Sequence, residues 1–535
     1  MRDPVDKNAN STLIGHLRQA RCYPHPVASV ELLETHISWV LLTGDYAYKI
    51  KKPVALGFLD FSTLQQRRLC CEEELRLNRR LAPQIYLDVV RITGDQTYPR
   101  INGDGPVIEY AVRMKQFAQD ALASALLAAG RLMPPQLQEL AATLAVFHQT
   151  VPATDAGSAW GSTQAILESA LQNFDQLSPL LPGDEAAALA ALRAWTMHEY
   201  GSLQAVMEQR RIGGRVRECH GDLHLGNIVL VDDKLVPFDC IEFNPALRWN
   251  DVISEAAFLV MDLHDRGSPR LAWLFLNTYL EHCGDYAGLA LLPYYLVYRA
   301  MVRAKVHGLR AAQPGLAGNK RISLLAASRN YLALAKACAQ RPPPALIITH
   351  GLSGSGKSSI AAELMQGLGA IRIRSDVERK RRHGLAPQDR SGDAVGTGLY
   401  SDQATLALYR HLAALARQTL AAGWPVIIDA AFLRRRQRDL LRGVAREAGV
   451  SFLIMAVTAP EEVLRARIAT RAAAGSDPSD AGIPVLEHQL ATREALAAGE
   501  ADAMVGLSSE TLDPAAGARQ VIGALAAIRM RRNPV

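Results

Sequence analysis

The stretch GLSGSGKSS, residues 351–359, has the residue types and spacing of a loop that binds phosphate groups. It satisfies the pattern G-x-x-x-x-G-K-[ST] between an apolar run, ALIITH, and a helical run, SSIAAELMQGL. In this context the glycines let backbone N–H groups face the phosphates, Lys357 reaches the outer phosphates, and Ser358 ligates magnesium. The sequence therefore predicts an ATP and Mg²⁺ site formed by Gly351, Ser353, Gly354, Ser355, Gly356, Lys357, Ser358 and Ser359.

A second group of residues could carry out phosphoryl transfer. The segment CHGDLHLGNIVLVDDKLVPFDCIEF contains H-x-D-x-x-x-x-N as His220, Asp222 and Asn227, and Asp239 follows two strand-like runs. Transfer from ATP needs one carboxylate to orient the attacking hydroxyl and accept its proton, and further oxygen ligands to hold magnesium. Asp222 fits the first role, and Asn227 and Asp239 fit the second.

The sequences HGDLHLGN and PFDCIEFN closely resemble the catalytic loop and metal-binding segment of the aminoglycoside phosphotransferase and choline kinase branch of the protein-kinase-like fold. The resemblance implies a strand lysine that holds the ATP phosphates and pairs with a helix glutamate. Lys49 is the first choice for the lysine, with Lys51 on the same strand face as the alternative. Glu74 is the first choice for the glutamate, with Glu73 as the alternative.

This half also departs from the family in two places. No G-x-G-x-x-G loop is present to cover the phosphates, and the expected first strand with its turn is not evident. Cys240 replaces the tryptophan that usually follows the metal-binding aspartate. The resemblance makes His220 a residue that braces the catalytic loop.

The segment IRIRSDVERKRR places Asp376 at the end of a short strand, with Arg379 three residues later. This S-D-x-x-R pattern resembles small P-loop kinases of the zeta-toxin, gluconate-kinase and polynucleotide-kinase type. The resemblance implies that Asp376 takes the proton of the acceptor hydroxyl and that Arg379 grips the substrate or a phosphate. The alternative is a helix N-cap aspartate followed by an exposed arginine.

Two later segments could complete this site. The strand PVIIDAAFL ends at Asp429, where a Walker-B carboxylate would approach magnesium, most often through water; contact with the acceptor is the alternative. The segment VLRARIATRAAAGSDPSDAG resembles a lid, with Arg467 and Arg471 on one helix face and the stretch 475–477 behind them. Lid arginines neutralise charge on the transferred phosphoryl group. A solvated helix face remains the alternative, and Arg465 is a further candidate.

Several folded parts must position these residues, because 535 residues exceed one hydrophobic core. Two strands joined at Gly44-Asp45, a helix over about residues 63–81 and two further strands predict a small sheet with one helix. The rest is mainly helical up to a boundary at Pro342-Pro343-Pro344, except for a strand-rich stretch at residues 216–242. The expected fold class is multidomain α+β and α/β: a bilobal kinase-like domain, then a parallel α/β P-loop domain. The predicted parts are an N-lobe (1–115), a helical C-lobe with the catalytic loop (116–340), a linker (341–344) and the P-loop domain (345–535).

Composition predicts a soluble protein of the cytoplasm. Hydrophobic residues make up 49% of the chain, yet no run reaches the roughly 18 apolar residues of a membrane span, and the N-terminus has no signal-like apolar region. The seven cysteines lack metal-site spacing and are expected to be reduced. Arginine-rich clusters at 379–383 and 434–438 are either solvated helix faces or an attraction for a polyanionic substrate; without aromatic residues between them they argue against an RNA-binding module.

Together these features predict an ATP- and Mg²⁺-dependent phosphotransferase with two nucleotide sites and a small-molecule hydroxyl acceptor. The whole chain resembles bacterial bifunctional proteins that join an aminoglycoside-phosphotransferase-like half to a P-loop ATP-binding half, described as an AAA family ATPase or zeta-toxin-like kinase. Two alternatives stay open: one half is a regulatory ATP-binding module, or the chain is a toxin-like or RNA-end kinase. The acceptor is not identified, because acceptor pockets carry no fixed motif.

Overall fold

The computed structural model describes residues 7–56, 59–155, 157–181, 183–313, 315–341, 343–389, 397–474 and 481–532. The chain divides into two compact units. Unit 1 comprises Met1–Leu140, Thr150–Ser169 and Gln204–Leu259, and unit 2 comprises Ala141–Gln149, Ala170–Leu203 and Val260–Val535. The domain boundaries expected from the sequence stay predictions.

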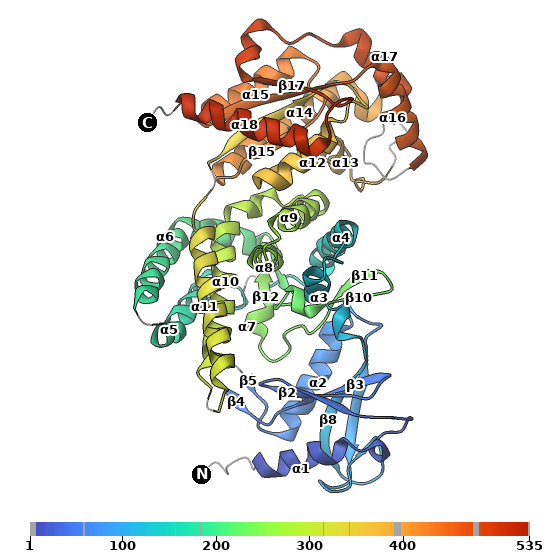
Figure 1. Cartoon of the computed structure of the whole chain (residues 1–535), viewed down its shortest axis with the longest axis vertical. Helices are drawn as coiled ribbons and strands as arrows, with labels where there is room; N and C mark the ends of the chain where they lie inside the picture. The colour runs from blue at the N-terminus through green and yellow to red at the C-terminus, as the bar shows by residue number, and fades with distance from the viewer. Residues whose placement is uncertain are drawn as a thin grey trace. The chain divides into compact units, whose positions relative to one another are not determined.

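Unit 1 is built on a six-stranded antiparallel sheet with the order β1-β2-β3-β8-β6-β7 (Figure 1). Its strands are β1 (Glu31–Glu34), β2 (Ser38–Leu42), β3 (Tyr46–Lys51), β6 (Tyr86–Thr93), β7 (Arg100–Ile101) and β8 (Val107–Lys115). The structure confirms the two strands on either side of the Gly44-Asp45 turn. It corrects the expectation of no evident first strand, because β1 pairs with β2. β1 carries little sequence signal, because its four residues, ELLE, do not alternate between apolar and polar. Neither of its leucines is fully buried in the structure.

One helix covers each face of this sheet. On one face, α1 (Lys7–Leu17) packs leucine and isoleucine side chains against Tyr48 and Ile50 of β3. On the other, α2 (Leu64–Asn78) contacts β6 and β8. Thr63 starts α2 with a capping box, since its Oγ1 accepts a hydrogen bond from the N–H of Gln66 at 3.2 Å while the Gln66 side chain accepts from Thr63 N–H at 3.1 Å. This start fixes the rotation of α2 and turns Glu74 toward the sheet, where it is fully buried.

The strand-rich stretch expected at 216–242 is a hairpin with short flanking elements. β10 (Ile228–Val231) pairs with β11 (Lys234–Pro237), so Asn227 and Asp239 stand at the same open end. Val229 and Val236 of the hairpin share a core with the main sheet. The other short elements of unit 1 are η1 (Ala20–Cys22), β4 (Ala55–Leu56), β5 (Leu59–Asp60), η2 (Gln119–Ala121), α3 (Ala123–Ala128), β9 (Val216–Glu218), η4 (Leu225–Asn227), α7 (Pro245–Arg248) and β12 (Trp249–Asp251).

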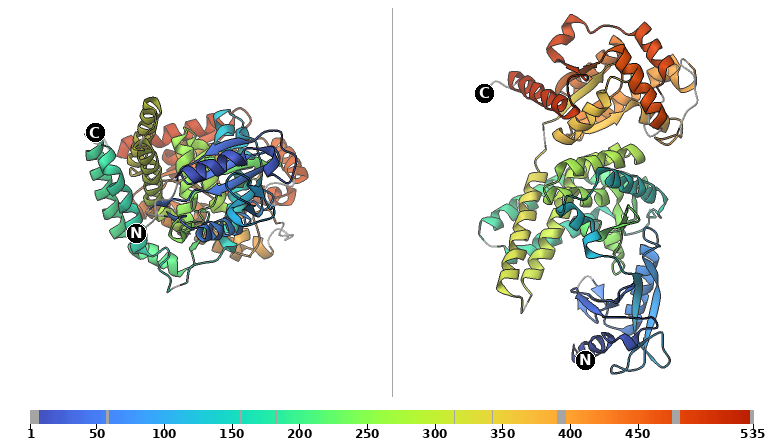
Figure 2. Two further views of the ribbon diagram at one scale, coloured as in Figure 1. Left: turned by 90° about the horizontal axis from the view of Figure 1, so that it is seen from below. Right: turned by 45° about the vertical axis from the view of Figure 1, so that its right-hand side comes forward.

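Helices dominate the chain between the antiparallel sheet and residue 340, as expected. Those with residues in both units are α4 (Pro134–Thr150), α5 (Thr163–Leu177), α6 (Asp184–Ile212) and α8 (Val252–Asp265). Unit 2 alone contains η3 (Ser178–Leu180), α9 (Pro269–Cys283), η5 (Tyr286–Ala290), α10 (Leu292–Ala311) and α11 (Gly318–Cys338). Figures 1 and 2 show α10 and α11 lying side by side.

Unit 2 also holds a five-stranded parallel sheet with the order β14-β15-β13-β16-β17. Helices α12 and α18 pack together on one face of it, and α14 and α15 on the other (Figure 1). The elements are β13 (Ala345–His350), α12 (Lys357–Leu368), β14 (Ile371–Arg374), α13 (Ser375–Arg381), η6 (Gly398–Tyr400), α14 (Asp402–Ala421), β15 (Val426–Asp429), α15 (Arg435–Glu447), β16 (Ser451–Thr458), α16 (Glu461–Ala474), α17 (Ile483–Thr492), η7 (Ala498–Ala503), β17 (Met504–Ser508) and α18 (Pro514–Arg532). The antiparallel sheet, the mainly helical stretch that follows it and the parallel P-loop sheet together confirm the predicted fold class.

The strand order of the parallel sheet positions the predicted chemistry. Because all five strands run in one direction, their carboxyl ends meet at one edge, where α/β sheets bind ligands. The phosphate-binding loop follows β13, Asp376 follows β14, and Asp429 ends β15. These three strands are neighbours in the sheet, so the three segments lie together although they are up to about 80 residues apart.

Within the described parts of the chain, no helix is both long enough and apolar enough to span a membrane. All seven cysteines are free thiols, as expected. Burial raises the pKa of the Cys70 thiol to about 11, so the adjacent pair Cys70-Cys71 lacks the thiolate character of a redox site.

Candidate active sites

Most of the predicted residues of the P-loop half line one cavity of about 280 Å³ at the carboxyl edge of the parallel sheet, whereas Gly351 and Ser355 of the loop are not among its lining residues. The phosphate-binding loop forms one wall, and the start of α13, the end of β15 and the helix α16 contribute the others. The predicted residues found together in the lining are Ser353, Gly354, Gly356, Lys357, Ser358, Ser359, Asp376, Arg379, Asp429, Arg467 and Arg471. Their roles in catalysis and binding stay predictions.

The backbone of the loop requires glycine where it enters α12. Gly356 is the N-cap residue of α12 and has a left-handed φ of 84°. A residue with a side chain would be strained in this conformation. This conformation aims the N-terminus of α12 at the cavity, where the positive end of the helix dipole stabilises an anion. Lys357, the first residue of α12, is half-buried and its Nζ donates to the carbonyl oxygen of Leu352 at 3.3 Å.

Two oxygen ligands meet at the base of this cavity. The hydroxyl of Ser358 donates to Oδ1 of Asp429 at 3.1 Å. Asp429 is only 4% exposed, and its Oδ2 has no hydrogen-bond partner among the described residues. A buried carboxylate oxygen of this kind requires compensation, and a hydroxyl beside a carboxylate is a hard oxygen pair that suits magnesium. The residues therefore fit a magnesium ion bound with nucleotide.

Asp376 and Arg379 do not show the alternative arrangement of a helix N-cap and an exposed arginine. The N-cap residue of α13 is Arg374, and Asp376 lies within the first turn, facing the cavity. Arg379 is half-buried, donates to the carbonyl oxygen of Leu399 at 2.5 Å, and stacks over the ring of Tyr400 at 4.8 Å. Both side chains thus border the space in front of the phosphate-binding loop.

The candidate lid arginines divide into two groups. Arg467 donates to the Oγ and the carbonyl oxygen of Ser509 at 2.7 and 3.0 Å, and Arg471 donates to the carbonyl oxygen of Ala481 at 2.6 Å, while both line the cavity. Arg465 instead forms ion pairs with two exposed glutamates at 2.8 and 3.2 Å and is not part of the cavity lining. The predicted stretch 475–477 lies outside the described residues.

Several cavity residues have no signal in the sequence. Arg374, Tyr400 and Tyr409 line the cavity, and Gln489 of α17 accepts the N–H of Ser353 at 2.8 Å through its Oε1. Gln489 lies more than a hundred residues after the loop and belongs to no motif. Only the tertiary fold brings it there.

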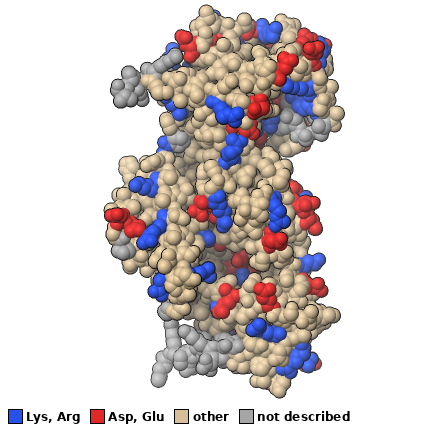
Figure 3. All heavy atoms as spheres, viewed as in Figure 1, with Lys and Arg blue, Asp and Glu red and all other residues tan. Residues whose placement is uncertain are grey.

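The arginine-rich clusters are partly structural. Arg438 is completely buried and donates two hydrogen bonds to Glu500, at 2.8 and 3.0 Å. Lys380, also buried, donates to the carbonyl oxygen of Pro387 at 3.1 Å. On the face shown in Figure 3, basic and acidic side chains are interspersed. These contacts account for part of the basic excess without a polyanionic ligand.

In unit 1, both candidate lysines bind the same glutamate. Lys49 Nζ donates to Glu74 Oε1 at 2.8 Å, and Lys51 pairs with the other carboxylate oxygen of Glu74. Lys49 also forms an ion pair with Asp239, and Lys51 with Glu242. Burial alone would raise the pKa of Glu74, but the two ammonium groups outweigh it and lower that pKa to about 2. Lys49 is therefore the lysine that links the helix glutamate to the predicted metal-binding aspartate.

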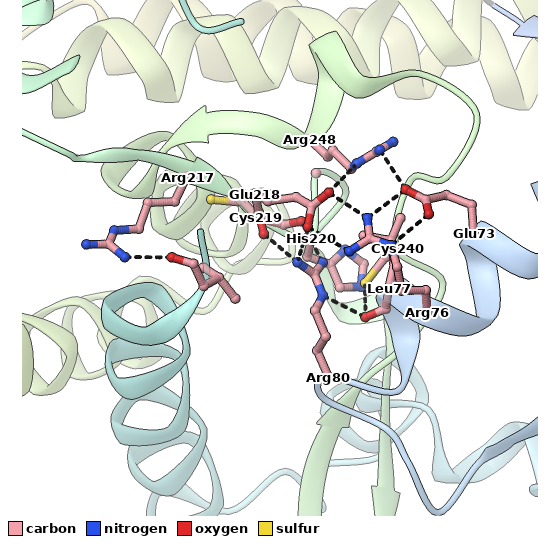
Figure 4. A network of polar contacts seen from close by, with 12 residues as sticks. Glu73, Arg76, Leu77, Arg80, Arg217, Glu218, Cys219, His220, Cys240 and Arg248 are labelled. Atoms are coloured by element: carbon pink, nitrogen blue, oxygen red, sulfur yellow. Dashed lines mark hydrogen bonds and ion pairs between the residues drawn. The ribbon is translucent and has the colours of Figure 1, made fainter. Parts of the chain in front are cut away.

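Glu73, the alternative partner, belongs to a different network (Figure 4). Its carboxylate accepts hydrogen bonds from Arg76 and Arg248, both at 2.7 Å. Glu218 of β9 lies at the centre of this network, with Arg76 at 2.7 Å and Arg80 and Arg248 at 3.2 Å (Figure 4). The network ties α2 to the strand that precedes the catalytic loop, so it positions that loop.

Asp222 and Asn227 of the predicted catalytic loop contact each other. Asn227 Nδ2 donates to Asp222 Oδ2 at 3.0 Å and to its carbonyl oxygen at 3.1 Å. His220 is fully buried and donates its Nε2 proton to the carbonyl oxygen of Phe238 at 2.8 Å, which is the contact of a bracing residue. Asp222 keeps about a third of its side chain exposed, with a carboxylate that an acceptor can approach.

Asp239 has a strained backbone. Its φ of 65° is left-handed, and its N–H donates to Tyr86 Oη at 3.1 Å. A residue other than glycine in this conformation costs roughly 1–3 kcal/mol and is typical of functional sites. Its carboxylate is 41% exposed, and with the Asn227 amide oxygen it offers the hard oxygen donors that suit magnesium.

Glu74→Gln is expected to lower the free energy of unfolding of the kinase-like unit by about 3–5 kcal/mol, because it leaves the buried ammonium groups of Lys49 and Lys51 without their shared counter-ion. Urea denaturation checks this. Glu72→Gln, at an exposed position two residues earlier on α2, is the matched control and should leave the midpoint unchanged. An equal shift in both variants would contradict the assigned role of Glu74.

The ion pairs of Glu74 with Lys49 and Lys51 also predict that the stability of this unit depends on pH. Because the folded pKa of Glu74 is lowered from 4.5 to about 2, its stabilisation is complete above pH 4.5 and is lost as the pH falls toward 2. The difference in unfolding free energy between wild type and Glu74→Gln should therefore shrink over that window. A difference that stays constant from pH 6 to pH 3 would refute the lowered pKa.

Comparisons with known proteins find one family model, sequence relatives and solved structures that are similar to this chain. Residues 346–496 match the family model described as "AAA domain". Uncharacterized protein Rv2004c of Mycobacterium tuberculosis is 30% identical over 503 residues, which cover 92% of this chain and 95% of that protein. Among solved structures, a sugar kinase from Janibacter sp. HTCC2649 is similar to 35% of this chain and 98% of its own, with 24% identity and a TM-score of 0.27. Amicoumacin kinase hAmiN, solved with AMP-PNP, Ca²⁺ and Ami, is similar to 62% of this chain and 96% of its own, with 16% identity and a TM-score of 0.39.

The identity to Rv2004c extends over nearly the whole of both chains. It therefore includes the antiparallel, kinase-like part and the P-loop part together. The chain belongs to the family of Rv2004c, and its residues 346–496, in the P-loop part, match the AAA domain model.

Proposed function

We propose that this protein is an ATP- and Mg²⁺-dependent phosphotransferase that transfers the γ-phosphoryl group to a hydroxyl of a small molecule. One observation carries the proposal: a single cavity joins a phosphate-binding loop to a carboxylate, Asp376, that can accept a proton. An ATPase also positions a group that activates the attacking water, so transfer of the phosphoryl group to a small molecule is what distinguishes a phosphotransferase from it.

Each group at this cavity has a defined task. The N-terminus of α12 and Lys357 hold the β- and γ-phosphates. Ser358 and Asp429 would hold magnesium, which neutralises phosphate charge when bound with ATP. Asp376 orients the acceptor hydroxyl and takes its proton, and the arginines of α16 stabilise the transferred group.

The kinase-like unit is proposed as a second transfer site. Asp222 would accept the acceptor proton, Asn227 and Asp239 would hold magnesium, and Lys49 would bind the phosphates. The hydrogen bond between Asn227 and Asp222 and the ion pair between Lys49 and Asp239 support this assignment. The free thiols accord with action in the cytoplasm, where ATP is available.

A second candidate function follows from the β1–β2 turn. Residues 35–37 contain no glycine, and the Oγ1 of Thr35 closes the turn by accepting the N–H of Ser38 at 2.9 Å. Such a turn offers fewer free backbone N–H groups to phosphates, which favours a regulatory role for this half. Calorimetry of Lys357→Ala protein with a non-hydrolysable ATP analogue shows whether this half binds nucleotide, since one equivalent should then remain. Loss of a labelled product on Asp222→Asn separates a transfer site from a regulatory one.

The function itself is tested by incubating the full chain with γ-labelled ATP and a deproteinised bacterial metabolite extract. Label should appear in a phosphorylated small molecule in a Mg²⁺-dependent manner. Release of label only as inorganic phosphate, at the same rate with and without extract, would exclude a phosphotransferase.

A further inference from the structure

Helix α9 precedes the parallel sheet in sequence by more than sixty residues, yet it completes the exposed side of its edge strand. β14 is the first strand in the sheet order, so one side of its backbone has no neighbouring strand. The Asn277 side chain pairs with two backbone groups at this edge: Nδ2 donates to the carbonyl oxygen of Ala370 at 3.1 Å, and Oδ1 accepts the N–H of Arg372 at 2.7 Å. Asn277 is 1% exposed, so this pairing takes the place of a sixth strand away from water.

One turn further along α9, Glu281 neutralises two arginines of the same strand. Its Oε1 accepts from Arg372 at 3.0 Å, and its Oε2 lies 3.9 Å from the guanidinium of Arg374. Arg374 lines the cavity in front of the phosphate-binding loop. The glutamate on α9 therefore helps to fix a charged group of the cavity wall.

The end of α9 also holds α13, the seven-residue helix that carries Asp376 and Arg379. Arg381 donates to the carbonyl oxygens of Glu281 and His282 at 2.6 and 3.3 Å, where a helix C-terminus attracts a cation. In the next element, η5, the Tyr286 hydroxyl donates to Glu378 at 3.3 Å. Contacts from α9 and η5 thus reach residues on both sides of Asp376.

Apolar packing makes this attachment rigid. Leu274 of α9 is part of the buried core formed by β13, β16 and α12. The rings of Trp273 and Trp424 meet edge to face at 5.4 Å, and the indole N–H of Trp424 donates to the carbonyl oxygen of Leu289 at 3.0 Å. Close-packed cores resist displacement, so α9 and β14 behave as one body.

We propose that Asn277 and Glu281 are positioning residues of the P-loop site, which hold β14 and α13 so that Asp376 and Arg379 face the bound phosphates. This inference rests on the phosphotransferase function proposed for the cavity. Neither residue is itself part of the cavity lining, and each acts through the strand that precedes Asp376. Transfer at the P-loop therefore depends on helix α9.

The test uses the full chain with Asn277→Ala and, separately, Glu281→Gln. A displacement of about 1 Å can cost a large part of the rate, so kcat for phosphoryl transfer should fall about tenfold or more. The Kd and KM for ATP should stay within threefold of wild type, because the phosphate-binding loop is untouched. Arg270→Ala is the matched control on the same helix: it removes an exposed ion pair with Glu363 (2.5 Å), makes no contact with β14, and should leave kcat unchanged.

Hydrogen exchange of the same proteins provides a readout that does not need activity. Amides of residues 371–381 should exchange faster in the two α9 variants than in wild type, with β13 and β15 unchanged. If wild type transfers phosphate, the kcat of the two α9 variants tests the inference. A kcat within twofold of wild type would overturn it, and so would parallel losses in kcat, ATP affinity and melting temperature. If wild type shows no transfer, the proposed function fails, and unchanged exchange at 371–381 would overturn the positioning role as well. Should Asn277→Ala fail to fold, Glu281→Gln decides by the same criteria.

Discussion

Lys357→Ala is expected to lower kcat/KM for transfer at the P-loop site about 10²- to 10³-fold, the loss usual for one preorganised charge acting on the reacting group. Lys357 begins α12, lines the cavity, and is the lysine of the phosphate-binding motif. ATP affinity at this site should fall too, because the lysine binds the phosphates before and during transfer. Steady-state kinetics with the acceptor and calorimetry with an ATP analogue measure the two effects.

The fold should tolerate this change. Lys357 is half-buried and lies at the cavity wall rather than in the apolar core, so the melting temperature should move little. Lys320→Ala, at an exposed lysine of unit 2, is the matched control and should be kinetically silent. Lys357→Ala protein with wild-type turnover of the P-loop product would show that this loop is not the nucleotide site.

Asp376→Asn is expected to lower kcat at the P-loop site about 10²- to 10⁴-fold, because asparagine keeps the size of the side chain but cannot accept a proton. ATP binding should remain within a few-fold of wild type, since Asp376 follows β14 and is not part of the phosphate-binding loop. This separation of kcat from ATP affinity is the mark of a group that acts on the acceptor. Single-turnover transfer and equilibrium binding, measured side by side, check it.

Asp402→Asn provides the comparison, because Asp402 is an exposed aspartate in the first turn of α14. It should leave both kcat and ATP affinity unchanged. If Asp376→Asn retained more than a tenth of the wild-type kcat, the proton acceptor would have to be another group.

The sequence predicts most of what lies within one contiguous motif. The glycine pattern, the apolar strand before it and the helix after it are local features, so β13, the loop and α12 follow from them. The hairpin that carries Asn227 and Asp239 is similarly local, because a turn at Asp232-Asp233 joins its two apolar strands.

Side-chain contacts between segments that are far apart in the sequence cannot be predicted from local motifs. Strand alternation puts Lys49 and Lys51 on one face, so the sequence cannot choose between them; in the structure both bind Glu74. Adjacent residues on a helix point about 100° apart, and only the position of α2 on the sheet shows that Glu74 rather than Glu73 faces the lysines. Gln489 reaches the P-loop site, and Asn277 reaches the neighbouring strand β14, from helices that carry no motif for such contacts.

The short first strand, β1, is an element that local sequence patterns do not predict. β1 has only two apolar residues and no glycine-rich turn, so neither alternation nor turn chemistry reveals it, and pairing with β2 defines it. The buried Arg438 is a similar case, because a run of arginines predicts a solvated face until its partner, Glu500, is known from the fold.

Under the proposed function, the chain contains two phosphoryl-transfer sites that use different carboxylates. The most direct measurement compares label transfer from γ-labelled ATP to extract acceptors by Asp222→Asn, Asp376→Asn and the double variant. We expect each single variant to lose one labelled product and keep the other, and the double variant to lose both. Undiminished transfer by the double variant would contradict the proposal of two transfer sites. A single labelled product that only Asp376→Asn abolishes would show that the P-loop site alone is active.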